Sequence, residues 1–283
     1  MCNGSIMDKL ISFSLPLMVS GILQLAFNAV DIIVVGRFSG SQALAAVGST
    51  TALINVFTNL FIGISLGANV LAARFYAAGK DREMSETVHT SITLALISGI
   101  MMAVIGVLLA KWALEIMGTP DDVIGQSALY MRIYFMGMPF FMLYNYGAAI
   151  LRAIGDTKRP LIFLIISGIA NAALNMILVI LFHMGVAGVA IGTIISQLIS
   201  CVLVLTCLYR SEGSYQLRFS KLKINGAYME QIFQVGVPAG IQSTVINLSN
   251  ALLQSSVNSF GSIAMAGYTA ANNILGFLYM SVN

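Results

Sequence analysis

The sequence predicts an all-α membrane protein, a polytopic helical bundle, on three observations: its composition, its long uncharged stretches and the charge of the loops between them. Of its 283 residues, 58% are hydrophobic and 9% are charged, whereas soluble domains carry about 25% charged residues. So few charges cannot cover a surface that faces water. We therefore expect lipid to surround most of the protein.

Uncharged stretches long enough to cross a bilayer follow one another along the chain. A spanning helix needs about 20 mostly apolar residues, and helices are expected because backbone groups in hydrocarbon must bond within their own segment. The first stretch is too long for the apolar part of a signal peptide. The prediction is seven complete spans and an eighth begun, at residues 10–36, 43–73, 87–110, 127–151, 160–182, 187–209, 228–259 and 262–283.

Basic residues gather in every second loop. The second, fourth and sixth connections hold Arg74, Lys80, Arg82, Arg152, Lys158, Arg159, Arg210, Arg218, Lys221 and Lys223. Because short loops rich in Lys and Arg stay in the cytoplasm, the N-terminus and the even-numbered connections are expected on that side. The predicted location is the cytoplasmic (inner) membrane of a prokaryote, crossed several times.

A weak internal repeat divides the chain. Leu15-Pro16 in the first span resembles Val237-Pro238 in the seventh, and Ala43–Ala45 resembles Ala264–Ala266. Two halves in the same orientation are a known form of repeat in membrane proteins. We expect an N-terminal six-helix lobe at residues 1–210, a cytoplasmic inter-lobe linker at 211–227 and the start of a second, repeat-related lobe at 228–283. A complete second half would need more residues, so the sequence is expected to be C-terminally truncated.

One carboxylate, Asp31, lies deep in the first hydrophobic segment. An ionisable side chain within a span is costly unless it is solvated or paired, and it marks a functional site by default. The simpler alternative is that Asp31 lies near the outer end of its helix and meets water or Arg37.

Polar side chains in other positions are candidates to surround Asp31. Gln24 lies two helical turns before it on the same face. The whole set is Gln24, Tyr130, Asn145, Asn171, Asn175 and Thr193. Oxygen atoms of amides, hydroxyls and a carboxylate suit a hard cation such as sodium, so sodium is possible at Asp31. Each residue alone is also explained by hydrogen bonding between helices.

Pro16 and Pro238 lie inside predicted spans, where a proline removes a backbone hydrogen bond and kinks the helix. Each is either a static kink or a hinge.

The sequence contains no common hydrolase motif, nucleotide-binding loop or histidine cluster. It also lacks a basic patch interleaved with aromatic residues, as nucleic-acid binding would require. We expect no enzyme activity, no cofactor and no nucleic-acid partner.

The run Gly147–Pro160, which contains Leu-Arg-Ala-Ile-Gly-Asp-Thr-Lys, resembles the hallmark of multidrug and toxic compound extrusion (MATE) transporters. Pro16 and Asp31 in the first span are similar to the family's first helix. Further similar runs, which extend the resemblance over essentially the whole chain, are Ala43–Gly48, Ala72–Gly79 and Gly185–Gln197. The resemblance implies twelve helices in two six-helix lobes around a central cleft, and antiport in which sodium or protons enter as drug-like cations leave.

The resemblance also implies a coupling-ion site. One branch of the family uses an aspartate in helix one, an Asn and an Asp four apart in helix five, and a Thr in helix six. Those positions resemble Asp31, Asn171, Asn175 and Thr193, and the neighbouring polar residues resemble Gln24, Tyr130 and Asn145. Asn175 departs from the pattern because it replaces the second carboxylate. The other branch uses a glutamate in helix seven, and residues 231–260 contain no acidic residue.

The expected function is therefore a secondary active antiporter that exports drug-like, mostly cationic or amphipathic compounds in exchange for sodium or protons, working as a monomer in the lipid bilayer. One alternative is a lipid-linked precursor flippase of a related superfamily. Such proteins tend to have a cationic central cavity, whereas the basic residues here lie almost entirely in loops. Another alternative is a non-transporting membrane scaffold.

Overall fold

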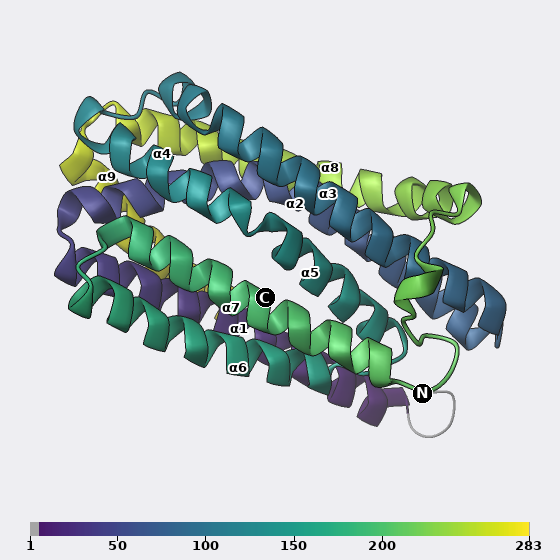
Figure 1. Ribbon diagram of the computed structural model, residues 1–283. Helices are drawn as coiled ribbons and strands as arrows, with labels where there is room; N and C mark the ends of the chain where they lie inside the picture. Colours follow the sequence, from purple (N-terminus) through teal and green to yellow (C-terminus); the bar gives the residue numbers. More distant parts are fainter. Residues whose placement is uncertain (1–5, 283) are drawn as a thin grey trace.

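The computed structural model describes residues 6–282, which form helices joined by short connections (Figure 1). No strand occurs in this part of the chain, which confirms the predicted all-α class. Residues 1–5 and 283, which the predicted lobe boundaries include, lie outside the described residues. In chain order the elements are α1 (Ile6–Phe38), α2 (Ser41–Ala77), α3 (Asp81–Ile116), α4 (Asp121–Met136), α5 (Met138–Ala153), α6 (Lys158–Met176), the π-helical turn η1 (Ile177–Leu181), α7 (Gly185–Arg210), the 3₁₀ turn η2 (Phe219–Lys221), α8 (Gly226–Asn258) and α9 (Ser262–Val282).

Five segments among the described residues are long and apolar enough to cross a membrane. They are Ile11–Phe38, Ser41–Ala77, Asp81–Ile116, Lys158–Leu181 and Gly185–Arg210. These segments coincide with the predicted first, second, third, fifth and sixth spans. The break predicted between the spans 160–182 and 187–209 is also present, because η1 ends at Leu181, α7 begins at Gly185 and His183 between them has a φ of 52°.

The predicted fourth span, residues 127–151, is wrong as a single helix, because α4 and α5 meet at Gly137. Pro139, at the start of α5, has no N–H with which to continue the ladder of hydrogen bonds from α4. Gly137 also lies close to α7: a Cβ at this position would lie 2.8 Å from side-chain atoms of Ile194 and Gln197. The break therefore allows the backbone to approach α7.

The helices form two groups with α4 and α5 between them (Figure 1). One group contains α1, α6 and α7, which pack side by side, and the other contains α2, α3 and α8. The large buried side chains, Phe135, Met138, Met142 and Tyr146 among them, come mostly from the middle segments. This arrangement leaves space for a cavity between α1, α2 and the α4–α7 segments.

A very close backbone approach joins α2 to α8. A Cβ on Gly63 would lie 2.2 Å from the Cα of Gly240, and a Cβ on Gly236 would lie 2.5 Å from the Cα of Ile64. Both helices carry glycines four residues apart, as helices that pack closely in membranes commonly do. The two helices can cross at this distance only because neither carries a side chain at the crossing.

Two side-chain hydrogen bonds join α8 to the residue after the end of α3. The carbonyl oxygen of Met117 accepts hydrogen bonds from Ser255 Oγ at 3.1 Å and from Asn258 Nδ2 at 3.0 Å. The Asn258 side chain is 2% exposed. The last turn of α8 is therefore fixed to the loop between α3 and α4.

Candidate functional site

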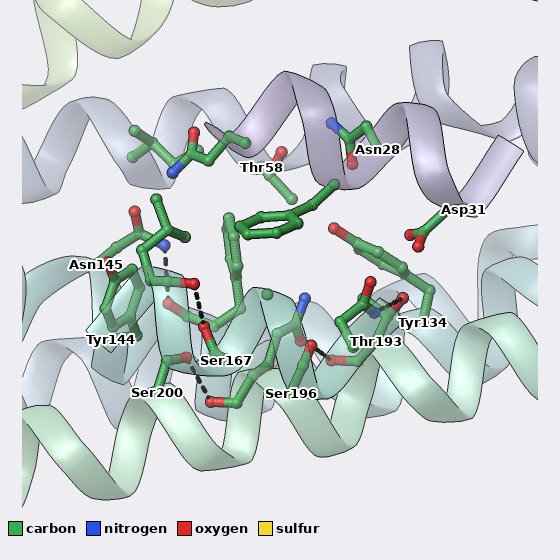
Figure 2. Close-up of a pocket in the computed structure, with 18 of the residues that line it drawn as sticks. Asn28, Asp31, Thr58, Tyr134, Tyr144, Asn145, Ser167, Thr193, Ser196 and Ser200 are labelled. Carbon is green, nitrogen blue, oxygen red and sulfur yellow. Dashed lines mark hydrogen bonds between the residues drawn. The ribbon is translucent and has the colours of Figure 1, made fainter. Parts of the chain in front are cut away.

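A polar cavity of about 400 Å³ lies between α1, α2, α4, α5, α6 and α7 (Figure 2). Six of the seven polar residues singled out in the sequence line it: Gln24, Asp31, Tyr130, Asn145, Asn171 and Thr193. The seventh, Asn175, is fully buried and bonds directly to Asp31. Figure 2 shows Asp31 toward one end of the cavity, and Tyr144 and Asn145 at the other.

Asp31 is held by a chain of hydrogen bonds that crosses from α1 through α6 to α7. The amide Nδ2 of Asn175 donates both to the Asp31 carboxylate and to Asn171 Oδ1, the latter at 3.3 Å. Asn171 Nδ2 donates in turn to Thr193 Oγ1 at 3.4 Å, and this hydroxyl donates to the carbonyl of Val189 at 2.9 Å. Asp31 is 9% exposed, so the alternative in which it simply meets water at a helix end does not describe its position.

The environment of Asn175 is unusually restrictive. Its Oδ1 atom is buried and has no hydrogen-bond partner among the described residues. A Cβ on Gly192 of α7 would lie 2.2 Å from that oxygen, so only a glycine at this position leaves room for the side chain. A buried polar atom without a partner costs about 1–3 kcal/mol. The arrangement therefore retains a free acceptor next to Asp31, the one carboxylate among the described residues that line the cavity.

Helical spacing explains how the cavity wall arises. Gln24, Asn28 and Asp31 are four and three residues apart and share one face of α1. Asn55 and Asn59 are four apart on α2 and also line the cavity. The sequence prediction missed Asn28, Asn55, Thr58, Asn59, Tyr134, Tyr144, Ser167, Ser196, Gln197 and Ser200. The spacing of Asn28 relative to Gln24 and Asp31 was a signal that could have identified this residue.

The serine and threonine hydroxyls of the described wall, and two of its asparagine amides, direct a proton at their own helix. Thr58 Oγ1 donates to the carbonyl of Ile54 at 2.8 Å, and Asn59 Nδ2 donates to the carbonyl of Asn55 at 2.6 Å. The same local pattern is made by Asn145, Ser167, Thr193, Ser196 and Ser200. A hydroxyl has one proton and two lone pairs. The oxygen atoms of these side chains are thus left as acceptors for a guest in the cavity.

Aromatic rings complete the wall. The rings of Tyr130 and Tyr134, one helical turn apart on α4, lie 6.0 Å apart at 31°. Phe27, Phe141 and Tyr144 also face the cavity, and the Tyr144 hydroxyl donates to the carbonyl of Pro160 at 3.2 Å. Aromatic faces attract cations. The wall therefore combines acceptor oxygens with rings, and both suit a positively charged guest.

The two prolines named as possible hinges lie away from this cavity. Pro16 is buried inside the continuous helix α1, where its carbonyl accepts from Ser20 Oγ at 2.7 Å. Pro238 lies inside α8 between the two glycines of the α2 crossing. Among the residues that the structure describes, no group of three or more His, Cys, Asp or Glu side chains is placed to hold a metal ion.

Comparison with known sequences gives one family. The MatE family model matches residues 16–177. The probable multidrug resistance protein YoeA of Bacillus subtilis (strain 168) is 34% identical over 277 residues, which cover 95% of this chain and 59% of that protein. The multidrug export protein MepA of Staphylococcus aureus (strain MRSA252) is 23% identical over 276 residues, which cover 97% of this chain and 61% of that protein. The chain thus spans about three fifths of the length of the curated relatives it matches.

Solved structures show the same fold. The MATE multidrug transporter DinF-BH has a TM-score of 0.90 at 23% identity, over 98% of this chain and 62% of that one. An inward-facing multidrug resistance MATE family transporter of the MOP superfamily has a TM-score of 0.82 at 21% identity, over 96% of this chain and 64% of that one. Both are membrane transporters, and the helices described above superimpose on the matching part of each.

Proposed function

Because this chain belongs to the MatE family, we propose that it acts in a secondary antiporter that exports drug-like, mostly cationic or amphipathic compounds in exchange for an ion. In this proposal residues 1–210 form the first six-helix lobe, 211–227 the inter-lobe linker and 228–283 the start of the second lobe. The protein works as a monomer in the cytoplasmic membrane, with its N-terminus in the cytoplasm. The names of the relatives support export of drug-like compounds, and the basic loops support the orientation of the N-terminus.

The observation that carries the proposal is that Asp31 is the only charged side chain among the described residues that line the cavity. A buried carboxylate without a nearby cation is unfavourable, and a proton, a metal ion or a cationic guest can neutralise it. The surrounding oxygens and rings favour the cationic guest. Competition between the guest and a coupling ion for one carboxylate produces exchange, because each binds best when the other has left.

We assign the coupling ion as a proton. A sodium ion at Asp31 would need several oxygen ligands facing it. Asn175 instead directs an N–H at the carboxylate, and the described residues of the cavity wall hold no second carboxylate. When Asp31 takes up a proton, its new O–H becomes a donor. Rotation of the Asn175 amide would then offer Oδ1, the atom without a partner, as its acceptor.

The proposal predicts that Asp31→Asn abolishes coupled export. The protein in its natural full length is reconstituted in proteoliposomes, and movement of a fluorescent cation is followed under an imposed pH gradient or an equal sodium gradient. We expect the pH gradient to drive transport by the unmodified protein and neither gradient to drive it in the variant. The matched control is Asp121→Asn, which removes an exposed carboxylate at the start of α4.

Two results would contradict the proposal in different ways. Undiminished pH-driven transport by Asp31→Asn would show that this carboxylate does not carry the ion. Transport driven only by sodium and lost in Asp31→Asn would keep the site and overturn the assignment of the proton. A flippase of anionic precursors is disfavoured because no Lys, Arg or His lines the described cavity. A non-transporting scaffold would show no gradient-driven movement in either protein.

A further inference from the structure

A second hollow, of about 800 Å³, lies where the segment leading into α8 crosses the start of α3. Three basic side chains line it: Arg82 from α3, and Lys221 and Lys223 from the segment between α7 and α8. The hydroxyl-bearing residues Ser85 and Thr90 also contribute to the wall. The hollow has no part in the cavity around Asp31, whose lining residues are entirely different.

Hydrogen bonds fix this segment on α3. The backbone N–H of Arg218 donates to His89 Nε2 at 3.1 Å, while His89 Nδ1 lies 2.6 Å from the carbonyl of Ser85. The backbone N–H of Asn225 donates to Thr90 Oγ1 at 3.2 Å. His89 and Thr90 are 4% and 0% exposed. Since both anchors are buried, the backbone on each side of Lys221 and Lys223 is held in place before any ligand arrives.

The charge of the hollow is positive. Its one acidic residue among the described lining residues is Glu86, and both oxygens of this carboxylate already have partners. One oxygen accepts from Arg82 Nε at 3.1 Å, and the other accepts from Asn225 Nδ2 at 2.7 Å. Lys221 and Lys223 form no ion pair within the described residues. Two uncompensated positive charges therefore face the hollow.

The same segment carries exposed apolar side chains. Phe219 is 54% exposed and Leu222 is 36% exposed, and they alternate with basic residues. The Phe219 ring stacks on Tyr209 near the end of α7, with ring centroids 5.8 Å apart at 27°. Aromatic side chains gather at the membrane–water boundary, and basic residues interspersed with Phe and Leu are typical of segments that lie in it. These features suit a position at the level of lipid headgroups.

We propose that this hollow binds the phosphate headgroup of an anionic phospholipid of the adjacent leaflet. Lys221 and Lys223 neutralise the phosphate, Ser85 donates a hydrogen bond to it, and the acyl chains lie against Phe219 and Leu222. Basic pockets between membrane helices are suited to such headgroups. A lipid held there bridges the start of α3 and the start of α8. A soluble phosphate compound offers the same charge without the acyl chains, and the exposed apolar residues favour the lipid over it.

Lipid retention measured by native mass spectrometry tests this proposal. The full-length protein is extracted from bilayers that contain phosphatidylcholine and phosphatidylglycerol in equal amounts, and the bound lipids are counted. We expect retained phosphatidylglycerol to fall about tenfold or more in the Lys221→Gln/Lys223→Gln variant, since each basic residue adds separately to the attraction. The matched control is Lys158→Gln/Arg210→Gln, which removes two exposed charges outside the hollow and should leave retention unchanged.

A second arm separates the two sources of phosphate. Millimolar inorganic phosphate or glycerol phosphate is added before extraction, and it should leave the retained phosphatidylglycerol in place. Displacement by these soluble compounds, or equal retention of phosphatidylglycerol by the double variant and the unmodified protein, would overturn the proposal. Equal retention of phosphatidylcholine and phosphatidylglycerol by the unmodified protein would overturn it as well. Both pairs of residues are exposed, so each variant should keep the melting temperature of the unmodified protein.

Discussion

Replacing Gly63 by alanine adds one methyl group at the point where the backbones of α2 and α8 cross. The new Cβ would lie 2.2 Å from the Cα of Gly240 and 2.3 Å from its backbone nitrogen. Both obstructing atoms belong to the backbone of a helix, so no side chain can turn aside to make room. The two helices must separate, or one of them must bend.

The size of the effect follows from these distances. Carbon atoms in contact lie about 3.5–4.0 Å apart, so the backbones must move by roughly 1 Å or more along the crossing. Overpacking of this kind costs about 1–3 kcal/mol. The cost should come near the upper end of that range, because the separation also loosens the neighbouring contact between Gly236 and Ile64.

Thermal unfolding of the purified protein in detergent measures this cost. We expect the melting temperature to fall by several degrees in Gly63→Ala. In the control Gly125→Ala it should hold or rise, because a Cβ at Gly125 in α4 meets no atom within 4 Å and alanine favours the helix by about 1 kcal/mol. A Cβ on Gly240 would lie 2.5 Å from the carbonyl oxygen of Leu60. The double variant Gly63→Ala/Gly240→Ala should lose less than the sum of the single losses, since one separation of the two helices makes room for both methyl groups. A melting temperature of Gly63→Ala equal to that of the unmodified protein would refute the close crossing.

Two further predictions concern the site and the linker. In Gly192→Ala the new Cβ collides with Asn175 Oδ1. Gradient-driven transport by this variant should therefore fall sharply, while the control Gly125→Ala transports normally. Equal transport by the two variants would show that Asn175 does not hold Asp31 in its working position. In His89→Ala the Arg218 N–H loses its acceptor, and an unmet buried hydrogen bond costs about 1–3 kcal/mol. Hydrogen exchange should then accelerate about tenfold or more in residues 211–225, and an unchanged rate there would show that His89 does not anchor the linker.

Five of the predicted spans and part of the site could be predicted from the sequence because they depend on local properties. Uncharged runs of sufficient length identify membrane helices whatever their neighbours are. The i, i+4 spacing places Asn171 and Asn175 on one face of α6, and a carboxylate in an apolar helix needs partners. Asp31 does bond to Asn175, which bonds to Asn171. What these residues carry in transport stays a prediction.

Features that depend on the packing between helices could not be predicted in this way. The break at Gly137 had a local signal in Pro139, but the residues near 137 do not reveal how closely α7 approaches there. Asn55 and Asn59 line the cavity, whereas Leu60, Ile64 and Gly67 of the same helix meet α8. Asparagine in a membrane helix most often bonds to a neighbouring helix. The amides of α2 therefore gave no sign by themselves of which side would face the cavity.

The serine and threonine hydroxyls of the cavity wall point their protons at their own helices, and this affects the range of compounds that the cavity can hold. A wall that fixes both donors and acceptors accepts only a guest with the complementary pattern, and it rejects close analogues strongly. A wall of oxygens with free lone pairs makes no such demand, because a guest that turns or slides exchanges one acceptor for another of similar strength. Charge and size should then decide which compounds are held. A change in a single uncharged wall residue would alter the affinity for many compounds slightly, and the affinity for no single compound greatly.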